Sequence, residues 1–170
     1  DLVTDAVDRL RAWTQACGRP PILLGHSLAA LVAVRIAQRR LADLDGLVLS
    51  SPPFAVNVPL WVRRTLTWMS LHAPDLPLPH GLAPARISHD RAVVKAYRAD
   101  PLVRRRMTGR LARFVDEAGQ QALREASLLP CRTLLMVAGD DAIVAAEGSR
   151  QFAQRAPAEL LTLRWYDTAW

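Results

Sequence analysis

The chain has 170 residues, of which 51% are hydrophobic and 22% charged, and its formal net charge at pH 7 is +6. This length and composition predict one globular domain with a sizeable core and exclude a disordered chain. The longest apolar run, residues 20–34, is interrupted by Gly25, His26 and Ser27 and is shorter than the roughly 20 residues of a membrane-spanning helix. We therefore expect no transmembrane segment, and no signal peptide is expected at the start of the chain.

The first part of the chain is predicted to alternate between helix and strand. Apolar residues recur at helical spacing over residues 1–16, and Gly18 supplies a stop signal. Residues 22–24 form a short apolar strand, and residues 28–40 are again helical. A second short strand over residues 47–49 ends in serines and prolines.

The alternation breaks in the middle of the chain. Residues 52–84 contain seven of the twelve prolines, and helical spacing is predicted over residues 60–71, 90–99 and 102–126. Ligands of open α/β sheets bind outside the carboxyl ends of the strands. Helices inserted between two strands of such a sheet are therefore predicted to form a cap over that edge.

The pattern of strand and helix resumes towards the end of the chain. Residues 132–138 and 160–166 read as apolar strands, with a helix over residues 146–156 between them. Short, uniformly apolar strands that alternate with helices favour an α/β fold with a parallel sheet covered on both faces. The predicted division is core over residues 1–53, helical cap over residues 54–126 and core over residues 127–170.

Basic residues concentrate in the predicted cap. Residues 54–115 hold eleven basic and three acidic side chains, a net charge of +8, and the rest of the chain is slightly acidic. Trp61, Trp68, Leu66 and Leu71 lie among these basic residues, which favours peripheral contact with an anionic membrane surface. A solvated arginine-rich face is the alternative. No recognition motif accompanies the charge, so we expect no nucleic-acid partner.

The two cysteines do not suggest a metal site or a disulfide framework. Cys17 and Cys131 are 114 residues apart, and no histidine lies near them at metal-ligand spacing. Two reduced thiols are the default for a cytoplasmic protein. We expect a cytoplasmic location, peripheral to the inner face of the membrane, and no metal.

The sharpest local signal is the run from Gly25 to Ala29, which reads GHSLA and joins a predicted strand to a predicted helix. A nucleophile elbow places its serine on such a turn and needs small residues two positions before and after it. Gly25 meets this demand, and Ala29 stands where the usual pattern has glycine. Ser27 is then the nucleophile, and the N–H of Leu28 would stabilise an oxyanion. The alternative is an ordinary turn whose serine caps the helix.

Several phrases occur together with this turn, namely residues 25–30, 47–52, 87–90 and 96–103. On these residues the sequence resembles the bacterial lysophospholipase and monoacylglycerol lipase-like branch of the α/β-hydrolases, which is often described as serine aminopeptidase-like. The resemblance runs over the full chain. It implies an α/β-hydrolase fold fragment that contains the last four strands of the parallel sheet and a helical cap insertion.

The resemblance also implies a catalytic triad in the order Ser, Asp, His. Ser27 matches the nucleophile, and Asp141 matches the acid, with Asp140 as the alternative; either aspartate could instead cap a helix. The family histidine follows the last strand, and residues 165–170 resemble its lead-in. The triad histidine is thus expected beyond Trp170, and the chain alone is expected to be nearly inactive. The histidines of the chain are not expected to serve as the base: His26, His72, His80 and His89.

The resemblance implies a serine ester hydrolase that acts on monoacyl lipid esters, monoacylglycerol or lysophospholipid, through an acyl-enzyme and without a cofactor. Apolar cap residues beside Arg63 and Arg64 would line an acyl tunnel and meet a charged headgroup, or else only pack the cap on the core. A non-catalytic lipid-binding module is the alternative function. The first strand is also expected to expose an unpaired edge that favours association.

Overall fold

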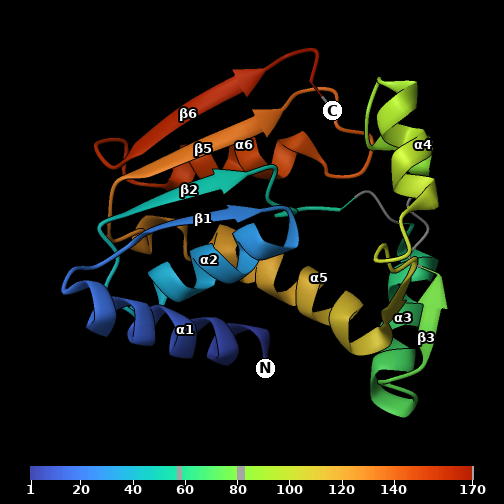
Figure 1. Ribbon diagram of the computed structural model, residues 1–170, viewed down its shortest axis with the longest axis horizontal. Coiled ribbons are helices and arrows are strands. Elements are labelled where there is room, and N and C mark those ends of the chain that lie inside the picture. The colour runs from blue at the N-terminus through green and yellow to red at the C-terminus, as the bar shows by residue number, and fades with distance from the viewer. Residues whose placement is uncertain (57–58, 80–82, 170) are drawn as a thin grey trace.

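The computed structural model describes residues 1–56, 59–79 and 83–169 (Figure 1). The elements before the insertion are α1 (Leu2–Cys17), β1 (Ile22–His26), α2 (Leu28–Gln38) and β2 (Gly46–Ser50). The insertion holds α3 (Leu60–His72), β3 (Pro77–Pro79), the 3₁₀ turn η1 (Pro84–Arg86), α4 (Arg91–Ala99), β4 (Arg106–Thr108) and α5 (Gly109–Arg124). The 3₁₀ turn η2 (Ala126–Leu128), β5 (Thr133–Ala138), α6 (Ala146–Arg155) and β6 (Leu161–Tyr166) complete the chain.

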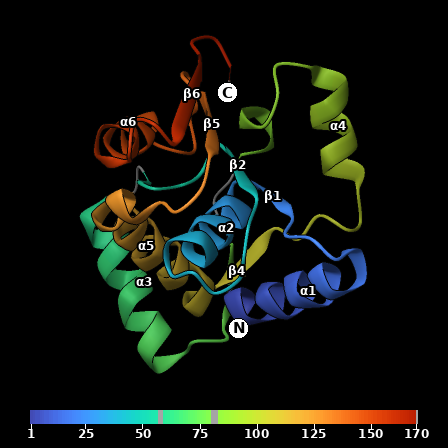
Figure 2. The same cartoon turned by 90° about the vertical axis from the view of Figure 1, so that its left-hand side faces the viewer.

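The main sheet has four parallel strands in the order β1-β2-β5-β6, which confirms the predicted α/β class. Each new strand is added in the same direction across the sheet. Because crossovers between parallel strands are right-handed, the helices that make these crossovers must lie on one face. Figure 2 shows the sheet nearly edge-on, with α1, α2, α5 and α6 all on the same side.

The prediction that both faces of the sheet are covered is therefore wrong within the described residues. On the helix-covered face, Leu49 and Leu135 are fully buried. On the opposite face, Ile22 is 66% exposed and Leu24 is 64% exposed. The strands are apolar on both faces, but a succession of right-handed crossovers in one direction supplies helices to only one of them.

The core lies between the covered face and its helices. Alanines of α2 allow close approach to the sheet, and Leu31 and Val34 of this helix are completely buried. Phe54, which follows β2, stacks on Phe152 of α6 with ring centroids 4.4 Å apart. Ala122 of α5 belongs to the same cluster. The C-terminal half of α5 thus packs in the core, although it falls in the range predicted as cap.

The elements α3, β3 and α4 of the insertion lie beyond the carboxyl ends of the strands, whereas α5 runs back beneath the sheet (Figure 1). The insertion contains an antiparallel pair, β3 with β4, that the sequence pattern did not predict. The helix predicted over residues 102–126 begins only at Gly109, because the Thr108 side chain caps it by accepting from the Leu111 N–H. A Cβ at Gly109 would lie 3.0 Å from the backbone nitrogen of Ser70, so glycine permits α5 to approach α3. No helix in the described ranges is long and apolar enough to cross a membrane.

Candidate active site

Ser27 occupies the strained turn that the sequence predicted between β1 and α2. Its backbone has φ 51° and ψ −121°, in the left-handed half of conformational space that residues other than glycine rarely adopt. The Ser27 N–H donates to the carbonyl of Ser50 at the end of β2, at 2.9 Å. The Ser27 side chain makes no capping hydrogen bond to α2. This geometry disfavours the alternative of an ordinary capping serine.

The structure explains why position 25 must be glycine. A Cβ on Gly25 would lie 2.5 Å from the carbonyl oxygen of Ala29 and 2.7 Å from the Cα of Ala30. No side chain fits at these distances, since the obstructing atoms belong to the backbone of the turn. Ala29, where glycine was expected, is exposed, so its methyl group meets no such restriction.

Leu28 is the first residue of α2, directly after Ser27. The first N–H groups of a helix have no acceptor within the helix, and the helix dipole makes this end favourable for negative charge. The first turn of α2 carries no acidic side chain that would oppose an anion. The start of α2 is therefore chemically suited to hold an oxyanion beside Ser27.

Asp141 lies in the loop that follows β5, and its half-buried carboxylate is fixed from one side. Oδ1 accepts from the backbone N–H of Ile143 at 2.8 Å and of Val144 at 2.9 Å. A carboxylate held through one oxygen can still accept at the other. Asp140 is exposed, and its backbone N–H donates to the carbonyl of Ala169 at 3.0 Å.

Ser27 and Asp141 both follow the carboxyl ends of strands in one parallel sheet. Only β2 separates β1 from β5, so the ends of these two strands are about 10 Å apart at the usual inter-strand spacing. The turn after β6 adjoins the Asp141 loop as well, because the Gly139 N–H donates to the carbonyl of Tyr166 at 2.8 Å. Three chain segments thus meet at one edge of the sheet.

The described histidines are engaged with other groups. His26 is exposed, and its Nδ1 lies 3.1 Å from the Ser50 hydroxyl. His72 stacks on Trp68 at 4.7 Å and bonds to the carbonyl of the same residue. His89 also lies on the insertion, and His80 falls outside the described residues.

Neither a metal site nor a cysteine nucleophile is supported by the described residues. In the described part of the chain, no group of histidine, cysteine and acidic residues could hold a metal ion. Cys131 comes two residues before β5, at the opposite edge of the sheet, and burial raises the pKa of its thiol. Because the thiolate is the nucleophilic form, Cys131 is not activated for attack.

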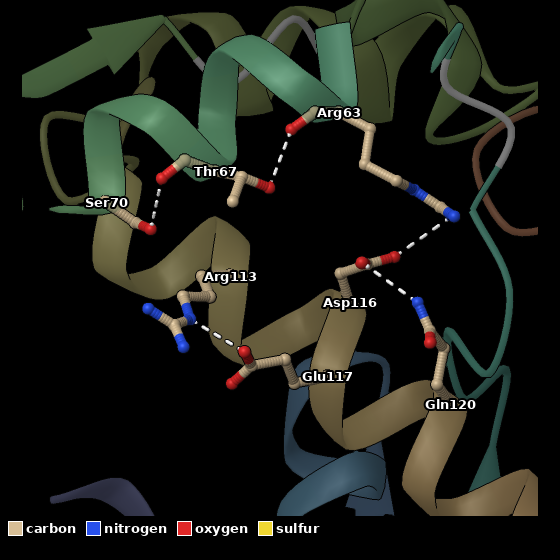
Figure 3. A network of polar contacts seen from close by, with 7 residues as sticks. All are labelled: Arg63, Thr67, Ser70, Arg113, Asp116, Glu117 and Gln120. Carbon is tan, nitrogen blue, oxygen red and sulfur yellow. Dashed lines mark hydrogen bonds and ion pairs between the residues drawn. The ribbon is translucent and has the colours of Figure 1, made fainter.

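A small cavity of about 170 Å³ lies between the segment after β2 and helices α3 and α5. Arg63 of α3 forms an ion pair of 3.0 Å with Asp116 of α5, and the Gln120 side chain donates to the second oxygen of Asp116, as Figure 3 shows. All three residues line the cavity. The network fixes the start of α3 against the helix that returns the chain to the core.

Two curated proteins are similar in sequence to this chain. A monoacylglycerol lipase from Mycolicibacterium smegmatis is 33% identical over 153 residues, which is 86% of this chain and 53% of that protein. The phospholipase YtpA from Bacillus subtilis is 29% identical over 145 residues, 81% of this chain and 56% of that protein. The chain therefore spans about half the length of these curated relatives.

A solved structure shows the same fold. The crystal structure of the monoacylglycerol lipase of Paleococcus ferrophilus superimposes with a TM-score of 0.88 and 31% identity, covering 96% of this chain and 65% of that one. A family model described as serine aminopeptidase, S33, matches residues 1–170. The chain belongs to this serine aminopeptidase S33 family of α/β-hydrolases.

Proposed function

We propose that this chain carries the nucleophile and the acid of a serine hydrolase that cleaves monoacyl lipid esters. The observation that carries the proposal is the backbone of Ser27, a serine with φ 51° between a parallel strand and a helix. Such strain persists only where the surrounding structure imposes it, and it is typical of functional residues. Ser27 directly follows β1, at the carboxyl edge of the sheet, which is where ligands of open α/β folds bind.

In the proposed reaction, the Ser27 hydroxyl attacks the ester carbonyl while a neighbouring imidazole accepts its proton. The carbonyl oxygen becomes an oxyanion, which the N–H of Leu28 stabilises, and the alcohol leaves with the proton from the imidazolium. Water then hydrolyses the acyl-enzyme by the same steps. Asp141 orients the imidazole and stabilises its charged form.

We assign the imidazole to a residue that follows Trp170 in the open reading frame. The turn after β6 supports this assignment, because it is hydrogen-bonded to the Gly139–Asp140 turn directly before Asp141. A histidine soon after Trp170 would therefore lie close to Asp141, the proposed acid. The chain of residues 1–170 alone then lacks the base and is expected to be nearly inactive, with only the rate enhancement that binding and the oxyanion site provide.

The substrate class rests on similarity to lipid hydrolases and on the insertion, residues 54–126, which acts as the cap in this proposal. The similar proteins are named monoacylglycerol lipase and phospholipase. The elements α3, β3 and α4 of the insertion lie beyond the carboxyl ends of the strands (Figure 1), the edge at which Ser27 follows β1. A cap of this kind excludes water and positions an acyl chain. Monoacylglycerol and lysophospholipid are both compatible with this position.

The outer face of α3 supports peripheral contact with an anionic membrane surface. Trp61 is 71% exposed, Trp68 59% and Leu71 62%, and the exposed Arg64 lies between the two tryptophans on the helix. The opposite side of α3 packs on α5, where Arg63 pairs with Asp116 and Ser70 is buried, so the exposed tryptophans are not needed for that contact. No acidic residue occurs between Leu60 and Pro74. Exposed tryptophans with basic neighbours are typical of helices that lie in the lipid interface.

Turnover of a lipid panel tests the hydrolase. The open reading frame that encodes residues 1–170 is expressed, and monoacylglycerols, lysophospholipids and short-chain esters are assayed for product. The Ser27→Ala and Asp141→Asn variants are expected to lose more than about 1,000-fold in kcat. Lipid binding without Ser27-dependent turnover would instead support the non-catalytic lipid-binding module.

Vesicle sedimentation tests the membrane contact separately. The protein is expected to sediment with vesicles that contain phosphatidylglycerol, less so at high salt because the attraction is screened. The double variant Trp61→Ala, Trp68→Ala should lose this binding. Trp13→Ala, which removes an exposed tryptophan of α1, is the matched control and should bind normally. Equal binding of both variants would contradict the assignment of the α3 face.

A further inference from the structure

Two segments of the chain meet where the insertion begins. The exit segment, residues 53–56, leaves the sheet after β2, and the acid loop, residues 141–145, follows β5. The acid loop holds Asp141 through its own backbone, because the Ile143 and Val144 N–H groups donate to the same carboxylate oxygen. Any displacement of this backbone therefore moves the carboxylate.

The exit segment and the acid loop are paired. Val56 and Val144 form an isolated antiparallel bridge. The Ala145 N–H donates to the Ala55 carbonyl at 3.1 Å. Val144 thus contributes to both sets of contacts, with its N–H on Asp141 and its backbone against the exit segment. The insertion and the proposed acid are connected through two consecutive residues of the loop.

The exit segment itself is held between two helices by glycines. A Cβ on Gly148 of α6 would lie 2.7 Å from the Ala55 nitrogen, and a Cβ on Gly119 of α5 would lie 2.8 Å from the Phe54 carbonyl oxygen. Both obstructing atoms are backbone atoms, which cannot rotate away as the end of a side chain can. Phe54 is also fixed by its stacking on Phe152, and both rings are buried. The segment has little freedom to shift while both helices stay in place.

We propose that the exit segment is a positioning element for Asp141, and that Gly148 and the Ala145–Ala55 hydrogen bond set its place. Packing of the exit segment against α6 then also determines the orientation of the Asp141 carboxylate. This inference rests on the proposed function, which assigns Asp141 as the acid of the triad. Ala145 and Gly148 touch neither substrate nor imidazole in this account, and they act through the loop backbone.

The coupling predicts a specific kinetic signature. A triad acid contributes by the direction of its hydrogen bond and by stabilising the imidazolium. A displaced carboxylate weakens both effects, which lowers kcat but leaves substrate binding in place. It also lowers the pKa of the imidazole, because less negative charge faces the cation. The acid limb of the pH profile of kcat/KM should therefore move to lower pH.

Proline at position 145 removes the connecting hydrogen bond and little else. Ala145 has φ −70°, close to the roughly −65° that proline requires. Val144 lies in a bridge, and such extended backbone is what the residue before proline prefers. The matched control is Ala146→Pro, one residue further, at the first position of α6 where proline is favoured and the N–H has no helical acceptor.

The experiment compares kcat, KM and pH profile for Ala145→Pro, Ala146→Pro and Asp141→Asn in the protein expressed from the full open reading frame. Ala145→Pro is expected to lower kcat by between about 10-fold and 100-fold, with KM changed by less than about twofold and the acid limb moved to lower pH. Ala146→Pro should match the wild type. Equal kinetics for the two proline variants would overturn the inference.

Two further variants keep the test decisive. If Ala145→Pro does not fold, Gly148→Ala is measured instead, with Gly46→Ala as control, since a Cβ at Gly46 would meet its nearest atom only at 3.4 Å. Asp141→Asn separates the two proposals. If it retains the wild-type kcat, the assignment of the acid fails whatever the prolines do. If it loses activity while Ala145→Pro and Gly148→Ala do not, only the coupling is wrong.

Discussion

The two faces of the four-stranded sheet differ in what covers them, although their sequences are similarly apolar. Leu134 and Leu135 are neighbours in β5 and point to opposite faces. Leu135 is completely buried under the helices, whereas Leu134 is only half-buried. The difference arises from topology, because every crossover between these strands delivers its helix to the same side.

Packing on the covered face of the sheet makes the proposed site rigid. α2, which begins directly after Ser27, packs against the covered face and against α5. Arg35 of α2 is buried and bonds to Glu125 at the end of α5, at 2.6 Å, and to Gln38 at 2.8 Å. The covered face thus supports the nucleophile turn. The open face contributes no packing of this kind within the described residues.

The largest expected effect on stability comes from truncating a leucine on the covered face. Leu135→Ala removes a fully buried side chain and leaves a cavity, which should lower the free energy of unfolding by about 2–5 kcal/mol. Leu134→Ala is the matched variant on the open face and should cost less than about 1.5 kcal/mol. Urea unfolding of both variants measures the difference, and equal losses would show that the two faces are packed alike.

The second largest expected effect is self-association of the chain through the open face of the sheet. β1 is an edge strand of the described sheet, and its exposed Ile22 and Leu24 form an apolar surface beside that edge. An unpaired apolar edge favours pairing with another chain. Sedimentation velocity of residues 1–170 should show concentration-dependent association that Leu24→Lys reduces. A monomer at all concentrations would mean that this side needs no cover.

A smaller, pH-dependent effect is expected from the contact between α2 and α5. The hydrogen bond from Arg35 lowers the pKa of Glu125 below its ordinary value of 4.5, against an opposing effect of burial. A lowered carboxyl pKa in the folded state means that the unfolded chain binds more protons in this range. The stabilisation is therefore present above about pH 4.5 and is lost as the pH falls through the lower folded value. Glu125→Gln should flatten the unfolding free energy over this window, and an unchanged slope would contradict the assignment.

The smallest effect is expected on the exposed side of α5. Arg113 and Glu117 form an ion pair at 2.7 Å with side chains 42% and 54% exposed. Exposed pairs at this helical spacing contribute no more than about 0.5 kcal/mol. Glu117→Gln should leave the unfolding midpoint nearly unchanged at moderate salt. A loss as large as that of Leu135→Ala would be inconsistent with a solvent-screened pair.

Local signals in the sequence were sufficient for the four strands of the main sheet, the helices of the core and the Ser27 turn. The GHSLA run could be interpreted from local sequence alone, because the residue that requires a glycine at position 25, Ala29, lies within the same five-residue run. The start of α3 and the helical α4 also agree with their apolar spacing. These features depend on residues close in sequence, which a periodic pattern can report.

Features that depend on distant segments could not be predicted. β3 contains two prolines, which argue against a strand, yet it pairs with β4, whose residues lie 27 to 31 positions further along the chain. The bridge between Val56 and Val144 joins residues 88 positions apart and has no local signature. The open face was missed because an apolar strand does not report which of its faces a helix covers.

Covalent labelling of Ser27 is the most direct test of the central claim, that a strained serine at the sheet edge is the nucleophile of an ester hydrolase. The protein expressed from the full open reading frame is treated with a fluorophosphonate, and the modified peptide is identified by mass spectrometry. We expect one adduct per chain, located on Ser27, with parallel loss of lipid-ester turnover and no adduct in Ser27→Ala. Full turnover with Ser27 unmodified, or an adduct on another residue, would contradict the account.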